Sequence, residues 1–189
     1  MAKRNYLVEG LSGAGKSSVY EQLVRRGYPA ISSDRVWGFH ADPETGLPGG
    51  PMQFDTWMWD RQKAVSELER PEPDVLFVCG SSRNPDDFLP LFTKVFNLRI
   101  DDDTMRRRLQ ERIVTDFDTL PPASERMWTP MQPEEVERML ELNRSGEKPA
   151  GAIDVDATQP LDQVVDELLR LATVQRGDGD ATRWSARNR

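Results

Sequence analysis

The stretch VEGLSGAGKSS, residues 8–18, carries glycine, lysine and serine in the order Gly-x-x-x-x-Gly-Lys-Ser. Three glycines, Gly10, Gly13 and Gly15, permit backbone conformations with positive φ, so that successive N–H groups can converge on one anion. A helix that begins near the lysine brings the positive end of its dipole to the same place. This is the spacing of the phosphate-binding P-loop, in which the lysine reaches the β- and γ-phosphates and the serine hydroxyl binds Mg²⁺.

The residues around the motif supply the strand, loop and helix that a P-loop requires. Residues 6–10 are mostly apolar and predict a strand, and residues 17–26 predict a helix. Since motif and context agree, we expect a nucleotide-phosphate site, with Ser17 as a ligand of Mg²⁺. The residues expected to contact the nucleotide there are Gly10, Ser12, Gly13, Ala14, Gly15, Lys16, Ser17 and Ser18.

Composition narrows the classes of protein that fit. The chain has 189 residues, a net charge of −7 and one cysteine, Cys79. The length suggests one domain, and a single cysteine excludes an internal disulfide. The negative charge disfavours a general attraction to nucleic acid, and no run is apolar and long enough to span a bilayer. We therefore expect a cytoplasmic protein that binds neither membrane nor nucleic acid.

Strands and helices are predicted to alternate along the chain. The further strands are expected at 29–32, 74–80, 94–100 and 152–157, and the further helices at 54–70, 86–92, 101–114, 133–144 and 159–172. Such alternation predicts an α/β three-layer fold of the P-loop NTPase type, a five-stranded parallel sheet flanked by helices. We expect a single domain over 1–175, with a mobile lid at about 115–132 and an acceptor-side segment at about 34–70, followed by a disordered tail at 176–189.

Ligands of such sheets bind at the carboxyl ends of the strands, so those ends are where we look for chemistry. The second strand ends in Ser-Ser-Asp-Arg, which includes Asp34 and Arg35. A carboxylate there could accept the proton of an attacking hydroxyl or hold Mg²⁺, while the alternative is an ordinary helix cap. Arg35 could bind an anionic substrate or pair with a neighbouring acid.

The third strand ends in Cys79-Gly80-Ser-Ser-Arg83. Many motor-type P-loop proteins have an aspartate at the cysteine position, so this sequence disfavours a GTPase or a motor. Cys79 is expected to be a small buried residue. Gly80 would let a ligand approach the backbone closely, and Arg83 is a candidate substrate contact.

Arginines precede the predicted lid. Arg108 and Arg112 lie one turn apart on one flank of the 101–114 helix, and Arg107 is expected to be a surface charge. A guanidinium suits phosphoryl transfer because its fork binds phosphate oxygens, so Arg108 and Arg112 are candidates to offset transferring charge. Arg126 in the lid could reach the phosphates when the lid closes and excludes water.

Aromatic residues cluster between the second and third strands. Trp57 or Trp59 could flank a substrate ring, although core packing explains at least part of the cluster. His40, the one histidine, lies in a polar loop and is expected to be a bystander.

In this order the motifs resemble the small P-loop phosphotransferases, namely the shikimate and gluconate kinase-like enzymes and the nucleoside monophosphate kinase group. The resemblance covers residues 5–174 and includes GLSGAGKSS, SSD, VCGSSRN, RRRLQER and DVDATQPLDQVVDELL. It implies that the last stretch lies beside the adenine, with Asp156, Ala157, Thr158 and Pro160 as its neighbours. The chain departs from the nucleotide-kinase pattern at Cys79-Gly80-Ser-Ser-Arg83, and from the paired aspartates of shikimate kinases at Ser32 and Asp34.

The function we expect is transfer of the γ-phosphoryl group of ATP, with Mg²⁺, to a hydroxyl of a small-molecule acceptor. The catalytic candidates are Lys16, Asp34, Arg108, Arg112 and Arg126, and the metal candidates are Ser17 and Asp34. The acceptor-side candidates are Asp34, Arg35, Trp57, Gly80 and Arg83. A nucleoside or nucleotide kinase is one alternative, and a regulatory P-loop protein whose output is nucleotide occupancy is another.

Overall fold

A computed structural model describes residues 4–51, 53–119 and 132–173, the side chains of 112–119 excepted. Five strands form one sheet in the order β2–β5–β1–β6–β7, and every neighbouring pair is parallel. Their bounds are Arg4–Glu9 (β1), Ala30–Ser32 (β2), Val75–Cys79 (β5), Lys94–Arg99 (β6) and Ile153–Asp156 (β7). All five predicted strands are therefore confirmed. The P-loop follows the central strand, β1.

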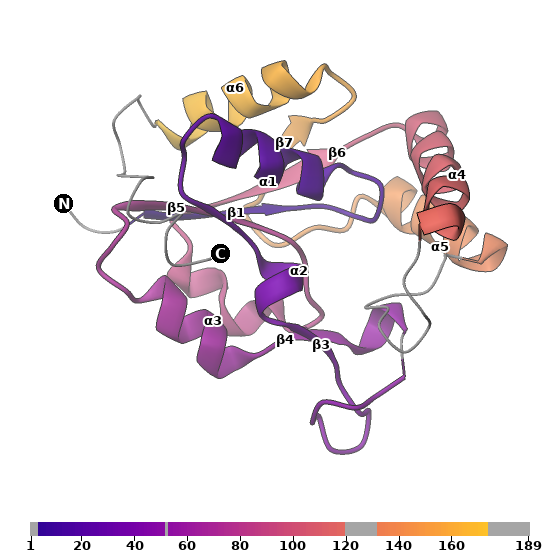
Figure 1. Ribbon diagram of the computed structural model, residues 1–189, viewed down its shortest axis with the longest axis horizontal. Helices are drawn as coiled ribbons and strands as arrows, with labels where there is room; N and C mark the ends of the chain where they lie inside the picture. Colours follow the sequence, from indigo (N-terminus) through magenta and orange to yellow (C-terminus); the bar gives the residue numbers. More distant parts are fainter. Residues whose placement is uncertain (1–3, 52, 120–131, 174–189) are drawn as a thin grey trace.

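Helices cover both faces of the sheet, as Figure 1 shows with the sheet seen nearly edge-on. On one face lie α1 (Lys16–Arg25) and α6 (Leu161–Ala172), and on the other lies α3 (Arg61–Leu68). Two more helices, α4 (Asp102–Thr119) and α5 (Pro133–Ser145), pack on each other beside the P-loop. The predicted three-layer α/β fold is confirmed.

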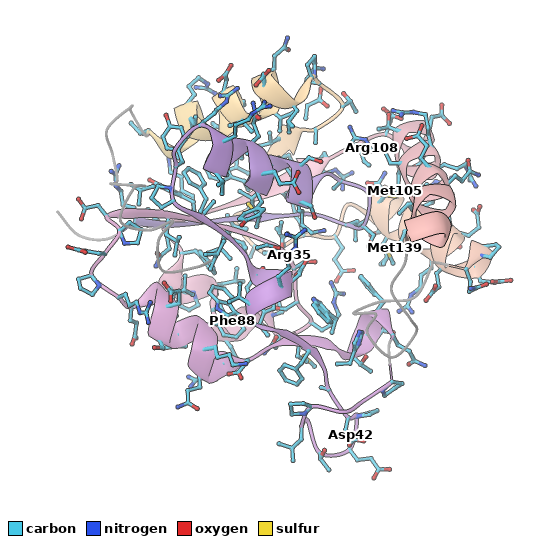
Figure 2. All side chains as sticks on the ribbon, viewed as in Figure 1. Arg35, Asp42, Phe88, Met105, Arg108 and Met139 are labelled. Atoms are coloured by element: carbon cyan, nitrogen blue, oxygen red, sulfur yellow. The ribbon has the colours of Figure 1, made fainter. Side chains whose placement is uncertain are left out.

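Alternating side chains of the sheet divide the interior into two cores. Tyr6 and Val8 of β1 join a core built with α1, α4, α5 and α6, into which Met105 and Met139 point from α4 and α5 (Figure 2). Leu7 faces the opposite core, built with Trp37, Trp59, α3 and Phe88. Because side chains of a strand alternate, Glu9 lies on the same face of β1 as Leu7.

The prediction of a helix over 54–70 is wrong for residues 54–60. The segment contains a 3₁₀ turn, η1 (Phe54–Thr56), and a strand, β4 (Trp57–Trp59), before α3 begins at Arg61. β4 pairs antiparallel with β3 (Gly38–His40), so part of the polar loop predicted around His40 is also a strand. The aromatic run of β4 favours extended backbone, and Trp59 packs at 5.4 Å from Trp37 between the ring centroids.

Smaller differences lie at other boundaries. One helical turn, α2 (Ser33–Val36), follows β2, and the helix predicted at 86–92 is two 3₁₀ turns, η2 (Pro85–Asp87) and η3 (Leu89–Leu91), each with a proline at its start. α4 continues through residues 115–119, which the sequence predicts as part of the lid. Residues 120–131 of the predicted lid and the predicted tail at 176–189 lie outside the described residues.

Among the described residues, no helix combines the length and the apolar character needed to cross a bilayer.

Candidate active site

The P-loop has the backbone that its glycines were expected to allow. Gly10, Gly13 and Gly15 have φ values of 149°, 85° and 104°, and Gly15 is the N-cap of α1. Gly10 also leaves little room for a side chain, since an added Cβ would lie 3.0 Å from the carbonyl oxygen of Leu98 on β6. The loop therefore joins the end of β1 to the N-terminus of α1 in an anion-binding conformation.

The hydroxyl and ammonium groups of the motif lie at the first turn of α1. Lys16 donates from Nζ to the carbonyl oxygens of Gly10 and Leu11, at 2.6 and 3.2 Å. Ser17 and Ser18 are exposed, and Ala14 is buried under the loop. A lysine held over its own loop has only to change acceptors in order to reach a phosphate.

Arg108 ties α4 to the P-loop and to the loop after β7. Its Nη1 donates to the carbonyl oxygens of Gly13 and Ala14, at 3.2 and 3.3 Å, and its Nη2 donates to Ala157 at 3.0 Å. Figure 2 shows Arg108 between α4 and the helix layer that carries the P-loop. Burial lowers the pKa of this guanidinium, with the charge of Arg107 as a second cause. In this arrangement the guanidinium links the P-loop to the loop after β7 by donating to carbonyl oxygens of both.

The predicted adenine neighbours form a compact turn before α6. The Asp156 carboxylate accepts from the Thr158 backbone N–H at 2.9 Å and from the Thr158 hydroxyl at 2.5 Å. These bonds, with one from Gln159, lower the pKa of Asp156. Pro160 is the N-cap of α6, and Arg108 reaches this turn through Ala157, so the turn and the P-loop are neighbours.

Asp34 is the second residue of α2, and its carboxylate bonds to other segments rather than to its own helix. Its Oδ1 accepts from the Ser81 backbone N–H at 3.3 Å and from the Trp57 indole Nε1–H at 3.4 Å. Both donors belong to other segments, the end of β5 and the hairpin strand β4. The capping alternative finds no support, because the carboxylate joins separate segments at the sheet edge.

Gly80 makes that arrangement possible. A Cβ at Gly80 would lie 1.9 Å from Ser33 Oγ and 2.7 Å from Asp34 Oδ1, and the residue has a φ of 159°. Ser33 Oγ in turn donates to the carbonyl oxygen of Cys79 at 3.1 Å. Cys79 is buried as predicted, and burial raises the pKa of its thiol. Close packing of α2 on the end of β5 thus fixes the position of Asp34.

Glu9, the last residue of β1, was missed by the sequence analysis. It lies directly before the P-loop, on the face of the sheet that carries α2 and the β3–β4 hairpin. Burial raises the pKa of its carboxyl to about 7, although the charges of Lys16 and Arg83 act in the opposite direction. The signal that could have found it is a carboxylate at the end of a strand that is otherwise apolar.

Arg83 stacks on an aromatic ring. Its guanidinium carbon lies 4.2 Å from the centroid of Phe54, and its backbone N–H donates to the Trp57 carbonyl at 2.9 Å. Arg138 of α5 approaches the same ring at 5.7 Å and pairs with Asp55 at 2.7 Å. The stacking leaves the N–H fork of Arg83 without a hydrogen bond to any side chain or carbonyl in the described part of the chain.

The remaining candidates divide into described and undescribed residues. Arg35 is exposed on α2 (Figure 2), and Trp57 is half-buried at the edge of the hairpin. Arg107 is exposed and pairs with Glu111 at 3.3 Å, as expected of a surface charge. The side chain of Arg112 and the whole of Arg126 lie outside the described residues. No group of three or more His, Cys, Asp or Glu residues that could hold a metal occurs in the part of the chain that is described.

No protein-family model matches the sequence, and a search of curated proteins finds no relative. Solved structures do match. A gluconokinase from Sinorhizobium meliloti aligns at a TM-score of 0.50 and 24% identity, over 90% of this chain and 94% of that one. A sugar kinase from Janibacter sp. gives 0.53 and 18%, over 94% and 98%, and a shikimate kinase from Bacteroides thetaiotaomicron gives 0.54 and 16%, over 90% and 99%. With its P-loop at the carboxyl edge of a five-stranded parallel sheet, this chain has the P-loop kinase-like fold.

Proposed function

We propose that the protein is an ATP-dependent kinase that transfers the γ-phosphoryl group to a hydroxyl of a small-molecule acceptor. The observation that carries the proposal is that two carboxylates, Asp34 and Glu9, lie at the carboxyl edge of the sheet beside a P-loop. The solved structures with the same fold include a gluconokinase, a sugar kinase and a shikimate kinase, whose names describe phosphoryl transfer to small molecules.

The nucleotide side of the site needs little rearrangement to bind ATP. The amides of the loop and Lys16 would hold the β- and γ-phosphates, and Arg108 would keep the loop next to the turn at Ala157 that borders the adenine. Arg112 and Arg126 remain candidates for offsetting the charge that spreads over the phosphoryl oxygens during transfer.

The residues present also fit Mg²⁺, the ion that such chemistry requires. Magnesium prefers oxygen ligands and is held by one or two protein groups together with phosphates and water. Ser17 offers an exposed hydroxyl, and Asp34 keeps Oδ2 without a hydrogen bond in the described structure. A bound Mg²⁺ would neutralise phosphate charge, and Ser17 and Asp34 are the residues we assign to hold it directly or through water.

The acceptor side supplies the group that takes the proton. In the proposed step, the acceptor oxygen attacks the γ-phosphorus, the bond to the β–γ bridging oxygen breaks, and ADP leaves. The acceptor's proton passes to a carboxylate, for which Asp34 and Glu9 are the candidates. A pKa of about 7 leaves Glu9 able to accept a proton at neutral pH. Arg83, Arg35, Trp57 and the backbone at Gly80 would border the acceptor.

The experiment is a measurement of ADP release with Mg²⁺ and ATP, in the presence and absence of single acceptors. Gluconate, other sugar acids, hexoses, shikimate and nucleosides form the panel, and ³¹P NMR identifies a phosphorylated product. We expect slow hydrolysis alone and at least about tenfold faster ADP release with one class of acceptor, a difference of about 1.4 kcal/mol in the barrier. Turnover that no acceptor changes, but that a protein partner does, would instead support the regulatory alternative.

A further inference from the structure

The β3–β4 hairpin places an indole N–H on the carboxylate that the proposed function uses. Trp57 Nε1 donates to Asp34 Oδ1 at 3.4 Å, across 23 positions of the chain. We propose that Trp57 is a positioning residue, which orients the Asp34 carboxylate so that Oδ2 faces the acceptor and the metal. This inference rests on the proposed function, because it presumes that Asp34 takes part in transfer.

The indole has little freedom to move. Its six-membered ring covers Gly38 of the partner strand, where an added Cβ would lie 2.1 Å from Cζ2 of Trp57. The His40 ring meets the indole edge-on, with centroids 4.9 Å apart and an interplanar angle of 61°. His40 is itself held by Thr56, since Nδ1 lies 2.9 Å from Thr56 Oγ1. The sole histidine of the chain therefore supports the tryptophan.

Asp34 is held by a second donor as well. Ser81 donates its backbone N–H to the same oxygen, Oδ1, at 3.3 Å, and Gly80 lets the two segments approach. Two donors from two segments define the plane of a carboxylate better than one. Since both bonds engage Oδ1, Oδ2 is left for ligands. Deletion of the indole N–H should allow the carboxylate to rotate without removing it.

The kinetic test is a double-mutant cycle with Trp57→Phe and Asp34→Asn. Trp57→Phe keeps an aromatic ring over Gly38 but removes the N–H. We expect kcat for transfer to fall about tenfold with the KM for ATP unchanged, and we expect no further loss when the substitution is added to Asp34→Asn, because a positioning residue acts only through the group it positions. The acceptor is whichever of gluconate, shikimate or deoxyadenosine is phosphorylated.

The cycle separates failure of this inference from failure of the proposed function. If Asp34→Asn retains full transfer, Asp34 is not part of the site and the proposed role of that carboxylate fails. The positioning role is overturned if Asp34→Asn loses transfer but Trp57→Phe leaves kcat unchanged, or if the two substitutions together lose the product of their separate losses. It is also overturned if Trp57→Phe raises only the KM for the acceptor, a result that would make Trp57 a contact for the acceptor.

Trp59→Phe is the matched control. Trp59 belongs to the same strand and is buried, and its Nε1 has no hydrogen-bond partner within the described residues. Its replacement therefore removes an indole N–H from the hairpin without removing a hydrogen bond. We expect Trp59→Phe to leave kcat within about twofold once the temperature is set below the melting transition of every variant. A loss of kcat equal to that of Trp57→Phe would show that the hairpin, rather than the N–H, matters, and would overturn the inference.

A second measurement needs neither acceptor nor activity. The chain has five tryptophans, so ¹H–¹⁵N spectra contain few indole signals, and Trp57→Phe identifies the one that belongs to Trp57. Asp34→Ala removes the acceptor of the hydrogen bond and should shift this signal more than it shifts those of Trp37 and Trp59. A Trp57 signal that stays in place in folded Asp34→Ala protein would overturn the contact itself.

Discussion

Ser81 donates its backbone N–H to the Asp34 carboxylate at 3.3 Å, which ties a residue two positions beyond the end of β2 to a residue two positions beyond the end of β5. Adjacent parallel strands end at the same edge of a sheet, so the bond places the carboxylate where ligands of such folds bind. An N-cap would instead accept from its own helix, one turn ahead. The geometry of Asp34 therefore differs from that of a helix cap.

Asp34→Asn is predicted to abolish most phosphoryl transfer without unfolding the protein. The amide keeps the shape of the carboxylate but cannot take a proton and binds Mg²⁺ poorly. We expect transfer to fall about a hundredfold or more, with little change in ATP affinity or melting temperature. Transfer rate, ATP affinity and thermal unfolding are measured on the one variant.

The matched control for Asp34 is Asp101→Asn. Asp101 caps α4 through a 2.7 Å bond from the Thr104 backbone N–H to its Oδ1, so it shows what an ordinary cap does. Its replacement should cost at most about 1 kcal/mol in stability and leave transfer unchanged. If both substitutions have this same mild effect, Asp34 has no role in the chemistry.

Lys16→Ala is predicted to eliminate turnover. The ammonium lies over the loop carbonyls of Gly10 and Leu11 and would contact phosphate oxygens whose charge changes during transfer. Loss of that contact should raise the barrier by roughly 3–4 kcal/mol, about a hundredfold to a thousandfold in kcat. ADP release is the measurement, and Lys63→Ala, which removes an exposed lysine on α3, should leave it unchanged. Near-normal turnover of the Lys16→Ala variant would exclude the proposed kinase activity.

The sequence predicts the sheet and the P-loop because both are local patterns. Each of the five strands is a short apolar run bounded by turn residues, and the loop conformation follows from glycines at fixed spacing. The β3–β4 hairpin could not be predicted in this way. Its strands have three residues each, and Gly38 pairs with Trp59 across a long loop, so tertiary packing of the tryptophans decides it.

The site could be predicted as far as residue types at strand ends allow. Position just after a predicted strand is enough to select Asp34, Gly80 and Arg83 as candidates. The structure brings these residues to one edge of the sheet. Glu9 could not be assigned, because its role depends on the face of β1 to which it points and on its burial. The stacking of Arg83 on Phe54 could not be predicted either, since 29 positions separate the two residues and the sequence pattern predicts a helix at Phe54.

Arg108→Ala is predicted to weaken nucleotide binding and to lower stability. The guanidinium bridges the P-loop carbonyls and Ala157, so its loss should separate the phosphate loop from the turn beside the adenine. We expect the KM for ATP to rise about tenfold. The free energy of unfolding should fall by about 1–3 kcal/mol, because partly buried carbonyl oxygens lose their hydrogen-bond donor. Arg107→Ala removes an exposed neighbour paired with Glu111 and should change neither quantity. Equal effects of the two substitutions would contradict the bridging role.

Glu9 is predicted to make the stability of the protein depend on pH. Burial raises its pKa from 4.5 to about 7, so between these values the folded protein binds a proton that the unfolded chain has released. The contribution of Glu9 to the free energy of unfolding is therefore fully present below about pH 4.5. It falls as the pH rises to about 7 and does not change further above that pH. Glu9→Gln removes the cost of the buried charge. Relative to wild type, the variant should gain up to about 3 kcal/mol in free energy of unfolding between pH 4.5 and pH 8, measured by urea denaturation.

Activity of the same variant separates a catalytic carboxylate from a buried one. If the ionised form of Glu9 accepts the proton of the acceptor, kcat/KM of the wild type should rise with pH through about 7, and Glu9→Gln should lose this rise together with most of the transfer. Glu69→Gln, which neutralises an exposed carboxylate after α3, reports the effect of one charge alone. A Glu9→Gln protein that is stabilised at pH 8 yet retains the wild-type pH profile would leave Asp34 as the proton acceptor. A variant that shows no change in stability between the two pH values would show that the Glu9 carboxylate is solvated in the folded protein.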